Sequence, residues 1–598
     1  MQFDYRKYKM LYTADFETST EAWNVEEARV WLWDICDKNL KHYTGTTIDT
    51  FMNRIIKTAC NSLYGFRNLA YDGVYILSWL LNNGYTHTQA ETNRMPRKTF
   101  KTIISGLGSH YAYAICTEYG CHITITDTLK YVNMSIEKSA ECYKLPIKKG
   151  TIDYDLFRPI DYTPTADEIE YIHNDTEIDM LTIQLNMQAG AYKFTQAGNA
   201  RFEFKSLFTD GEWDYLFPEL DLETDKFLRK AYAGGFVSYN PEYKDKIVFN
   251  CHSLDINSMY PAQMLHRPMP YSFPIPFSGK YENDEKYPLY VQRLSCSFSL
   301  KPNGIAMIST KKTFVKAENL YLSNSGATKQ TLTLANPDLE LFFLNYDVFD
   351  IEWLGGFKFM AKQGRELTPE EASQLTVDQC IELDGQGSYF YEYIKKWRYI
   401  KEHEPTGSAL RDYAKRMQNA LYGALATNPV RKSSIPKLDE SGKVVYDLVT
   451  SESDGAPTYL PAGIFITAWS RYFLITTIMK YRKYFIYCDT DSLYLKGVRP
   501  IEGFAVHKSL YGFFKVEHYI TMLKVVGAKR YIYYGREPKQ KADSFCITCC
   551  GADGDIKKKF TFDNFVTGTT FFGKKAVHNV KGGKHLYLTT YRLGKKPA

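Results

Sequence analysis

The stretch YFIYCDTDSLYLK, residues 484–496, places two apolar β-type runs on either side of a short acidic tip. Apolar runs of this kind around a turn predict a β-hairpin. A bare Asp-Thr-Asp turn is usually only hydrated. Here the apolar flanks would pack the hairpin on a sheet and hold Asp489 and Asp491 in place, so we interpret the tip as a candidate site.

The length and composition predict a large multidomain protein. At roughly 150 residues per domain, the 598 residues correspond to about four domains. The hydrophobic share of 44% and the 48 Tyr, 36 Phe and 8 Trp suffice for several buried cores. A single small binding module and an intrinsically disordered chain are therefore excluded.

Charge is distributed unevenly along the chain, whose formal net charge is +6. Residues 1–190 carry 19 Lys and Arg against 24 Asp and Glu, a balance of −5. Residues 556–598 carry ten basic side chains against Asp563, a balance of +9. A basic tail beside an acidic first domain is typical of a protein that binds a polyanion and collects cations elsewhere.

Cysteine usage and hydropathy favour a cytosolic protein. Twelve cysteines are too few for a disulfide framework, so reduced thiols are expected. Cys546 and Cys549 lack a second ligand pair at zinc-site spacing and are interpreted as structural thiols. The N-terminal stretch has no signal-peptide pattern. The most apolar segment, Gly463 to Met479, contains Arg471 and is predicted to be a buried helix.

Three regions show clear secondary-structure patterns. From Met10 to about residue 190, β-type runs alternate with helical patterns, which predicts an α/β or α+β domain. Residues 388–426 are strongly helical, and residues 429–458 predict a second hairpin with its turn at Asp439 to Gly442.

Asp15 and Glu17 form a candidate metal-binding pair. They lie two apart in a strand-like run, which places both side chains on one face. Two like charges about 4 Å apart repel by roughly 1–4 kcal/mol, so a divalent cation is an economical partner. The alternative is an N-cap in which Thr18 and Ser19 begin a solvated helix.

Two further pairs have helical spacing. Asn68 and Asp72 lie four apart, as do Tyr171 and Asp175, and this spacing places each pair on one helical face. With the strand pair, the two aspartates could hold two hard cations, the paired-metal arrangement with which nucleases cleave phosphodiesters. The alternative is that both aspartates cap helices or pair with Lys.

Other residues suggest a nucleotide site around the hairpin tip. Asp255 ends an apolar run just before a helix start. Lys415, Asn419 and Tyr422 form one helical stripe that suits a triphosphate, a sugar and a base, and Lys401 is a weaker phosphate candidate. An amphipathic helix with a solvated lysine is the alternative. The sequence has neither a Walker loop nor a dinucleotide fingerprint.

These segments, in this order, resemble the motifs of the protein-primed branch of family B DNA polymerases, the small-phage, phi-twenty-nine-like type. The resemblance runs from Asp15 to the C-terminal segment. Any one motif is weak, but eight in the right order are strong. They are DFET at 15–18, NLAYDG at 68–73, YIHND at 171–175, AYAGGF at 231–236, DINSMYP at 255–261, KRMQNALYG at 415–423, YCDTDS at 487–492 and KRY at 529–531.

The resemblance implies a role for each candidate residue. The exonuclease metal ligands would be Asp15, Glu17, Asp72 and Asp175, with Tyr171 and Lys149 assisting and Asn68, Thr128 and Leu129 binding the frayed 3′ strand. The polymerase metals would be held by Asp255 and Asp491, with Asp489 supporting. Substrate ligands would be Tyr260, Lys401, Lys415, Asn419 and Tyr422, with Lys529 and Tyr531 on the primer end. Tyr260 would exclude ribonucleotides, and each site would bind two Mg²⁺ or Mn²⁺ ions.

The implied fold class is α+β multidomain, with an RNase H-like 3′–5′ exonuclease domain, a right-hand polymerase and two insertions. The expected domains are the exonuclease (1–190), palm (191–310 and 457–545), first terminal-protein-region insertion (311–387), fingers (388–428), second such insertion (429–456) and thumb (546–598). The basic tail would follow the duplex backbone.

Three departures from the family pattern limit what can be transferred. Residues 361–387, an acidic and turn-rich stretch, are longer than the family pattern. Arg67 stands where His commonly precedes the asparagine of the second exonuclease motif, and Ala424 stands where Lys commonly follows Tyr-Gly. We transfer no DNA contact to these two positions.

The resemblance implies DNA-directed DNA synthesis with 3′–5′ proofreading on a linear viral genome, with strand displacement and initiation on a protein hydroxyl. Expected partners are template-primer DNA, dNTPs and the terminal (priming) protein. The chain would act as a monomer, or as a heterodimer with that protein, in the cytoplasm of an infected bacterium. Three alternatives stay open: an exonuclease whose C-terminal half merely binds nucleic acid, a non-catalytic single-strand binder, and a cellular-type family B polymerase.

Overall fold

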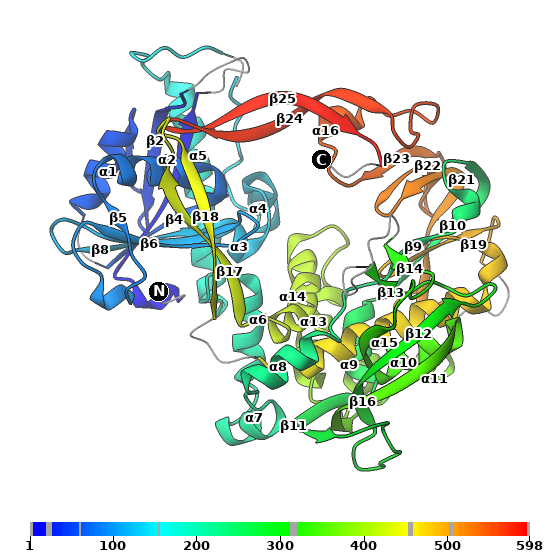
Figure 1. Ribbon diagram of the computed structural model, residues 1–598. Helices are drawn as coiled ribbons and strands as arrows, with labels where there is room; N and C mark the ends of the chain where they lie inside the picture. Colours follow the sequence, from blue (N-terminus) through cyan, green and yellow to red (C-terminus); the bar gives the residue numbers. More distant parts are fainter. Residues whose placement is uncertain are drawn as a thin grey trace.

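The computed structural model describes residues 4–19, 27–58, 61–153, 156–310, 320–452, 458–500, 504 and 506–594. Parts of the predicted domains, including 311–319, 453–456 and 595–598, lie outside these ranges. Figure 1 shows an N-terminal domain on one side of the molecule and two further sheets on the other. Helices α13 (Tyr391–His403) and α14 (Ala409–Leu425) lie between them.

The N-terminal domain is built on an eight-stranded mixed sheet of order β3-β2-β1-β4-β8-β7-β6-β5. Strand β1 pairs antiparallel with β2 and parallel with β4, so Asp15 and Glu17 lie on an inner strand and the solvated-helix alternative is wrong. The elements are β1 Met10–Thr18, β2 Val30–Asp37, β3 His42–Gly45, α1 Ile48–Ile56, β4 Ser62–Phe66, α2 Leu69–Asn82, β5 Thr86–His87, β6 Thr99–Ile104, β7 His110–Cys116, β8 His122–Asp127, α3 Thr128–Val132, α4 Ile136–Cys142 and α5 Ala166–Gln188.

A short helical linker, α6 Gln196–Lys205, α7 Asp210–Leu216 and α8 Leu222–Arg229, leads to a seven-stranded antiparallel sheet of order β23-β22-β21-β10-β20-β19-β9. The predicted hairpin is β19 Phe485–Asp489 and β20 Ser492–Lys496, and β20 pairs with β10 Ile247–Ile256. Its tip is fixed as predicted, since Thr490 N donates to Phe236 O at 2.8 Å. The other elements are β9 Val237–Tyr239, α9 Met259–His266, α15 Leu460–Lys480, β21 Phe514–Gly527, β22 Arg530–Arg536 and β23 Ser544–Cys549.

A separate four-stranded sheet of order β11-β16-β12-β15 follows α9 in sequence. This sheet has strands on both sides of residue 310, where we predicted a domain boundary. Strands β11 and β12 precede that residue, and β16, which follows it, pairs with both of them. The elements are β11 Met269–Phe277, β12 Leu289–Leu300, β13 Ile308–Ser309, β14 Tyr321–Leu322, β15 Gln330–Ala335, α10 Asn336–Asn345 and β16 Tyr346–Lys362.

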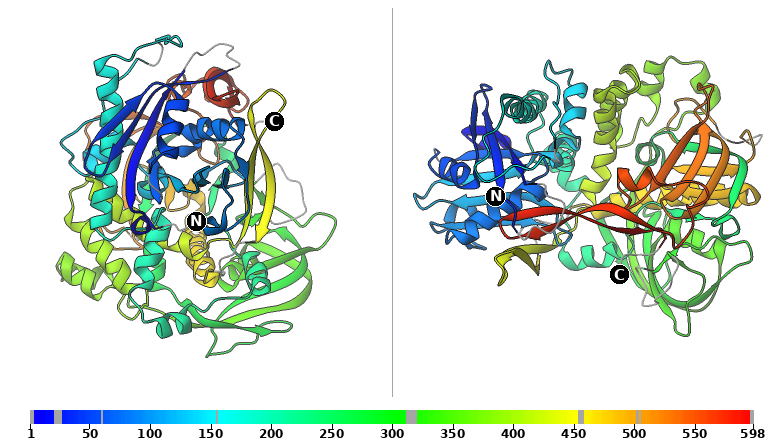
Figure 2. Two further views of the ribbon diagram at one scale, coloured as in Figure 1. Left: turned by 90° about the vertical axis from the view of Figure 1, so that its left-hand side faces the viewer. Right: turned by 90° about the horizontal axis from the view of Figure 1, so that it is seen from above.

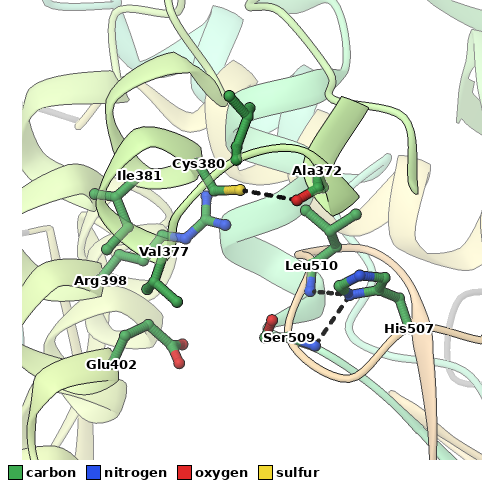
Figure 3. Close-up of a pocket in the computed structure, with 10 residues that line it drawn as sticks. Ala372, Val377, Cys380, Ile381, Arg398, Glu402, His507, Ser509 and Leu510 are labelled. Atoms are coloured by element: carbon green, nitrogen blue, oxygen red, sulfur yellow. Dashed lines mark hydrogen bonds between the residues drawn. The ribbon is translucent and has the colours of Figure 1, made fainter. Parts of the chain in front are cut away.

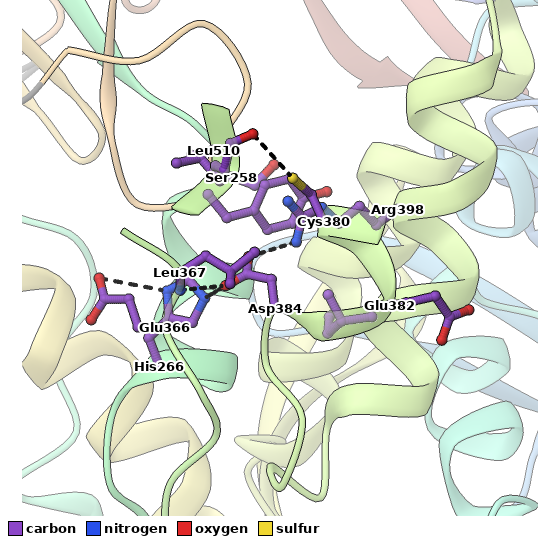
Figure 4. A network of polar contacts seen from close by, with 12 residues as sticks. Ser258, His266, Glu366, Leu367, Cys380, Glu382, Asp384, Arg398 and Leu510 are labelled. Atoms are coloured by element: carbon purple, nitrogen blue, oxygen red, sulfur yellow. Dashed lines mark hydrogen bonds and ion pairs between the residues drawn. The ribbon is translucent and has the colours of Figure 1, made fainter. Parts of the chain in front are cut away.

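The acidic stretch 361–387 is ordered by a buried ionic network. It contains α11 Pro369–Ser373 and α12 Val377–Leu383, and the predicted helical region follows as α13 Tyr391–His403 and α14 Ala409–Leu425. Asp384 accepts hydrogen bonds from His266 at 2.9 Å and Arg398 at 2.7 Å (Figure 4). Burial opposes ionisation, but these two partners lower the pKa of Asp384 below its usual value. A small pocket opens beside the network, between α12, α13 and residues 507–510 (Figure 3).

Two long hairpins reach the N-terminal domain from the rest of the chain. The predicted second hairpin is β17 Val430–Leu438 and β18 Val444–Glu452, and the basic tail forms α16 Gly554–Lys557, β24 Thr570–Val580 and β25 Gly583–Arg592. Both views show the β24–β25 hairpin spanning to the N-terminal domain beside β17 and β18 (Figures 1 and 2). Asn579 Nδ2 donates to Val444 O at 2.8 Å, and Tyr75 of α2 donates to Lys584 O at 2.8 Å.

Helix α15 is long and apolar enough to cross a membrane, but 67% of its most apolar window is buried inside the protein, as expected of a core helix. Ten cysteines within the described ranges are free. Cys121, directly before β8, is disulfide-bonded. The expectation of reduced thiols is therefore wrong for Cys121.

Candidate active sites

The N-terminal acidic cluster comprises Asp15 and Glu17 on β1, Asp72 on α2 and Asp175 on α5. Glu17, Asp72 and Asp175 are only 7%, 4% and 4% exposed. Burial, followed by the charge of Asp175, raises the pKa of Asp15 to about 8. Burial and the neighbouring carboxylates also raise the pKa of Glu17 and of Asp72 well above their usual values. The structure thus brings the four predicted carboxylates into one electrostatic cluster.

Lys149 and Tyr171 border this cluster, as the family resemblance implies. The Lys149 ammonium forms an ion pair with Oδ2 of Asp175 and lies 5.0 Å from the centroid of the Tyr171 ring. The other oxygen of Asp175, Oδ1, is buried and has no hydrogen-bond partner among the described residues. That oxygen is therefore suited to accept a cation.

Asn68 and Leu129 converge on Asp127, a residue that the sequence did not single out, whereas Thr128 does not. The backbone N–H groups of Asn68 and Leu129 donate to Asp127 Oδ1 at 3.1 and 2.9 Å. Thr128 is fully buried, and its hydroxyl donates to Asp179 at 2.6 Å, so that hydroxyl is not available to a substrate in this structure. An aspartate directly before a short helix is an N-cap signal that could have identified Asp127.

The two departures from the family pattern have internal roles. Arg67 pairs with Asp179 at 2.6 Å and donates to Met134 O at 2.8 Å, which links α5 to the segment before α4. Ala424 is buried on α14. Both side chains therefore stabilise the fold.

The second acidic cluster lies where β10 meets the hairpin tip. Asp255 faces Ser492 across the β10–β20 pair, and Ile256 N donates to Asp491 O at 2.8 Å. Burial, followed by the charge of Asp255, raises the pKa of Asp491 to about 6. The prediction that these distant carboxylates converge in the folded chain agrees with this geometry.

Two further charged residues on β21 face this cluster, and the sequence analysis missed both. Lys515 is paired with Asp255 in the β10–β21 register, and its Nζ lies 3.0 Å from Asp255 Oδ2. Burial, followed by the charge of Asp255, raises the pKa of Glu517. The two-residue spacing of Lys515 and Glu517 in a strand-like run could have indicated a shared face.

The predicted helical stripe lies over the second cluster. Lys415, Asn419 and Tyr422 belong to α14, and the charge of Lys415 lowers the pKa of Asp491, against the larger effect of burial. The ring of Tyr422 lies 4.4 Å from that of Tyr260, centroid to centroid. An ammonium and two aromatic rings thus adjoin the carboxylates, as a nucleotide site requires.

Two more predicted lysines approach this site. Lys401 Nζ donates at 2.9 Å to the hydroxyl of Ser258, just before α9. Lys529 Nζ lies 2.7 Å from both carboxylate oxygens of Asp489. Tyr531, on β22, is packed in an aromatic group with its neighbours on the sheet.

The Gly-Gly segment at 231–236 is held against the hairpin tip. The buried guanidinium of Arg471 donates to the carbonyls of residues 233 and 234 at 2.6 and 2.9 Å. The same group pairs with Asp338 on α10. A Cβ atom at Gly235 would lie 2.6 Å from Thr490 Oγ1, so the close approach requires glycine.

Both clusters have the chemistry of sites for hard divalent cations. Their donors are carboxylate oxygens, the ligands that Mg²⁺ and Mn²⁺ prefer. Raised pKa values mark Asp15 and Asp491 as carboxylates whose charge lacks full compensation, which a bound cation would supply. The residues present therefore fit divalent ions in both places.

Comparison with known proteins agrees with this arrangement. The family model of type B DNA polymerases, organellar and viral, matches residues 47–194 and 157–502. The chain is 36% identical over 605 residues to the DNA polymerase of Bacillus phage Nf, covering 98% of this chain and 100% of the relative. It is 34% identical over 606 residues to that of Bacillus phage phi29, covering 98% of this chain and 99% of the relative.

The solved structure of phi29 DNA polymerase complexed with primer-template DNA and incoming nucleotide substrates superimposes with a TM-score of 0.88 at 33% identity. The match covers 98% of this chain and 100% of that one. The fold and its two acidic clusters thus define a multidomain polymerase with an exonuclease domain and a palm, fingers and thumb.

The chain belongs to the type B DNA polymerases of the viral and organellar kind. It is a DNA-directed DNA polymerase, and its chemistry depends on divalent metal ions.

Proposed function

We propose that this chain replicates a linear phage genome from a terminal protein, proofreads its product in the 3′–5′ direction and displaces the non-template strand as it proceeds. The observation that carries the proposal is the presence of two acidic clusters on two separate sheets, one in the N-terminal domain and one at the hairpin tip. Two clusters allow synthesis and degradation to occur at different places in one chain. The proposed location is the cytoplasm of an infected bacterium.

The proposed domains follow the sheets. We keep the exonuclease domain (1–190), fingers (388–428), second insertion (429–456) and thumb (546–598). We move the start of the first insertion to residue 269, because β11 and β12 pair with β16 and not with the palm sheet. The palm then comprises residues 191–268 and 457–545.

In the proposed polymerase site, Asp255 and Asp491 hold two Mg²⁺ or Mn²⁺ ions, and Asp489 supports them. These ions, when bound, increase the acidity of the attacking hydroxyl and neutralise the departing pyrophosphate. Lys415 and Lys401 offset phosphate charge.

The remaining proposed substrate ligands select the nucleotide and hold the primer. Tyr260 and Tyr422 enclose the base and sugar, with Asn419 beside them on α14. Tyr260 also fills the space of a ribose 2′-hydroxyl. Lys529 and Tyr531 position the primer end.

In the proposed exonuclease site, Asp15, Glu17, Asp72 and Asp175 hold the ions that activate a water molecule. Lys149 positions Asp175 through their ion pair and offsets charge on the phosphodiester. Tyr171, next to the same ammonium, orients the water. Asn68 and Leu129 bind the frayed strand through the turn that Asp127 organises.

Strand displacement is proposed from the contact between the two long hairpins. Asn579 of the thumb hairpin donates to Val444 O of the second insertion, and Lys443 and Lys581 form a β-bridge. Lys581 also pairs with Glu27 of the N-terminal domain at 3.3 Å. These contacts close a loop of protein that would retain the template and leave no room for a second strand.

The proposed partner at initiation is a terminal protein. Its hydroxyl would attack the α-phosphorus of the first dNTP in place of a primer 3′-hydroxyl, with pyrophosphate as the leaving group. The first insertion offers the four-stranded sheet β11-β16-β12-β15 as a docking surface. We expect the free chain to be a monomer and the initiating form to be a heterodimer.

The two activities are tested with two variants assayed side by side. Asp491→Asn should abolish primer extension in Mg²⁺ and retain degradation of a single-stranded oligonucleotide. Asp15→Ala combined with Asp72→Ala should show the reverse. Asp447→Asn, at an exposed carboxylate of the second insertion, is the matched control. Unchanged synthesis by Asp491→Asn would favour an exonuclease with a nucleic-acid-binding C-terminal half.

Initiation and strand displacement need separate tests. Labelled dNMP should attach to the terminal protein of the same genome when no oligonucleotide is present, and failure would favour a cellular-type polymerase. For displacement, the double variant Lys443→Cys with Lys581→Cys is loaded on a primed circular template and then oxidised, so that a disulfide joins the two hairpins. This cross-link should lengthen the DNA products, because the enzyme stays on the template. Shorter products after such oxidation would contradict the role of the hairpin contact.

A further inference from the structure

A compact group of histidine and carboxylate side chains lies near the β3 edge of the N-terminal sheet. In the part of the chain that the structure describes, Asp34 on β2, His42 on β3 and His173 on α5 bring their ligand atoms within 4.8 Å of one another. His42 Nδ1 lies 2.8 Å from Asp34 Oδ2, and His173 Nε2 lies 3.4 Å from Asp34 Oδ1. Two imidazoles and a carboxylate from three elements thus converge.

The surrounding residues orient these three groups. Glu177 Oε2 lies 3.3 Å from His42 Nε2, the ring nitrogen that faces away from Asp34. Thr176 and Thr44 donate hydroxyl hydrogen bonds to Asp34 at 2.6 and 3.0 Å. A carboxylate on the far nitrogen of a histidine is the outer-shell arrangement that fixes metal-binding imidazoles.

Asp34 is a buried oxygen ligand without a fixed positive charge beside it. Its side chain is fully buried, and neither Lys nor Arg forms an ion pair with it among the described residues. Two hydroxyls and two imidazoles surround its oxygens instead. Its two ion-pair partners are the imidazoles, which bear charge only when protonated.

This group adjoins the catalytic carboxylates but uses a different face of α5. His173 and Glu177 lie four apart on α5 and share one face, whereas Tyr171 and Asp175 share another. A shift of two residues turns a helix by roughly 200°, so the two faces are nearly opposite. Asp34 is the direct cross-strand partner of Asp15, so the two carboxylates lie on one face of the sheet, on adjacent strands.

We propose that Asp34, His42 and His173 bind one Zn²⁺ ion, with Glu177 as the outer carboxylate and the fourth position open to water. Two imidazoles and one carboxylate are typical zinc ligands, whereas Mg²⁺ prefers oxygen donors. The ion would tie β2 and β3 to α5, the helix that carries Tyr171 and Asp175. Zinc would therefore act as a structural brace for the exonuclease domain, beside the catalytic carboxylates.

The test measures metal on the full-length protein. Purified wild type loaded with Zn²⁺ and dialysed against excess Mg²⁺ should retain one equivalent of zinc. His173→Phe keeps the ring that stacks on His42 and removes the ligand nitrogen, so it should retain none. His403→Phe is the matched control, because His403 also stacks on a ring and faces a carboxylate. Asp15→Ala with Asp72→Ala should retain the full equivalent.

Two further measurements exclude simple misfolding. Asp34→Asn, a nearly isosteric change, should also lose zinc. In EDTA, either Asp34→Asn or His173→Phe, or both, should have the thermal unfolding temperature of the wild type. Co²⁺-loaded wild type should show the visible absorption of a tetrahedral site, absent from His173→Phe. The proposal fails if wild type retains no zinc, if both variants keep it, or if it is lost with the catalytic carboxylates.

Discussion

The two acidic clusters use the same side chains but balance their charge in different ways. Among the four carboxylates of the exonuclease cluster, Asp175 forms an ion pair, with Lys149, within the described residues. In the palm, Lys515 lies 3.0 Å from Asp255, and Lys529 lies 2.7 Å from Asp489. The first cluster is thus an enclosed group of carboxylates, and the second is an open group with a lysine beside nearly every carboxylate.

This difference appears in the acidity of the two clusters. The pKa of Asp15 is raised to about 8, whereas that of Asp491 is raised only to about 6. Asp15 therefore needs a bound cation to be mostly ionised at neutral pH, whereas Asp491 is mostly ionised without one.

The largest expected effect is on the palm. Asp255→Asn should lower single-nucleotide incorporation by about 10³-fold, because it removes a group that stabilises developing charge. Degradation of single-stranded DNA should not change. Incorporation within tenfold of the wild type would contradict the assignment of Asp255 as a metal ligand.

The next effect concerns the single lysine of the exonuclease cluster. Lys149→Ala should lower the kcat of degradation by about 10²-fold, since the charge and the positioning of Asp175 are both lost. Lys148→Ala, at the exposed neighbouring position, is the control. Equal losses in the two variants would show that Lys149 has no special role.

A smaller effect is expected at a palm lysine. Lys529→Ala should raise the KM for primer-template by about tenfold, which corresponds to about 1.4 kcal/mol. The variant loses the ammonium that pairs with Asp489 and, with it, the proposed contact to the primer. Lys539→Ala, exposed after β22, should behave as the wild type. A change in kcat alone would point to a role in chemistry.

The smallest effect is on stability. The pKa of Asp15 is about 8 in the folded state and 3.8 ordinarily. Between pH 3.8 and pH 8, Asp15 is therefore protonated in the folded protein and ionised in the unfolded protein. In EDTA this contribution to stability is present at low pH and is lost as pH rises towards 8.

Asp15→Asn should therefore be more stable than the wild type at pH 8 in EDTA, by about 0.5–2 kcal/mol. The advantage should shrink at pH 5 and in Mg²⁺, as thermal unfolding can measure. A variant less stable than the wild type at pH 8 would show that the Asp15 charge is already compensated without metal.

Local patterns allowed much of the site to be predicted. The 484–496 hairpin, the β1 carboxylates and the α14 stripe each depend on spacing within a few residues, and the structure has all three. The helical patterns of 388–426 and Gly463 to Met479 likewise became α13, α14 and α15.

The features that escaped prediction depend on pairing between distant segments. Lys515 reaches Asp255 only because β21 pairs with β10, and the four-stranded sheet extends across residue 310 because β16 returns to β11 and β12. The burial of Thr128 depends on α5, which follows it by dozens of residues and supplies Asp179. Spacing within a sequence carries none of this information.

The buried salt bridge at Asp384 gives the fingers a mechanical linkage. Arg398 belongs to α13, three residues before Lys401, and His266 ends α9, the helix that carries Tyr260. One carboxylate thus connects α13 and the end of α9 to segment 361–387. The positions of the two helices are therefore coupled, and a change that shifts one of them would be transmitted to the other through a buried charge instead of through solvent.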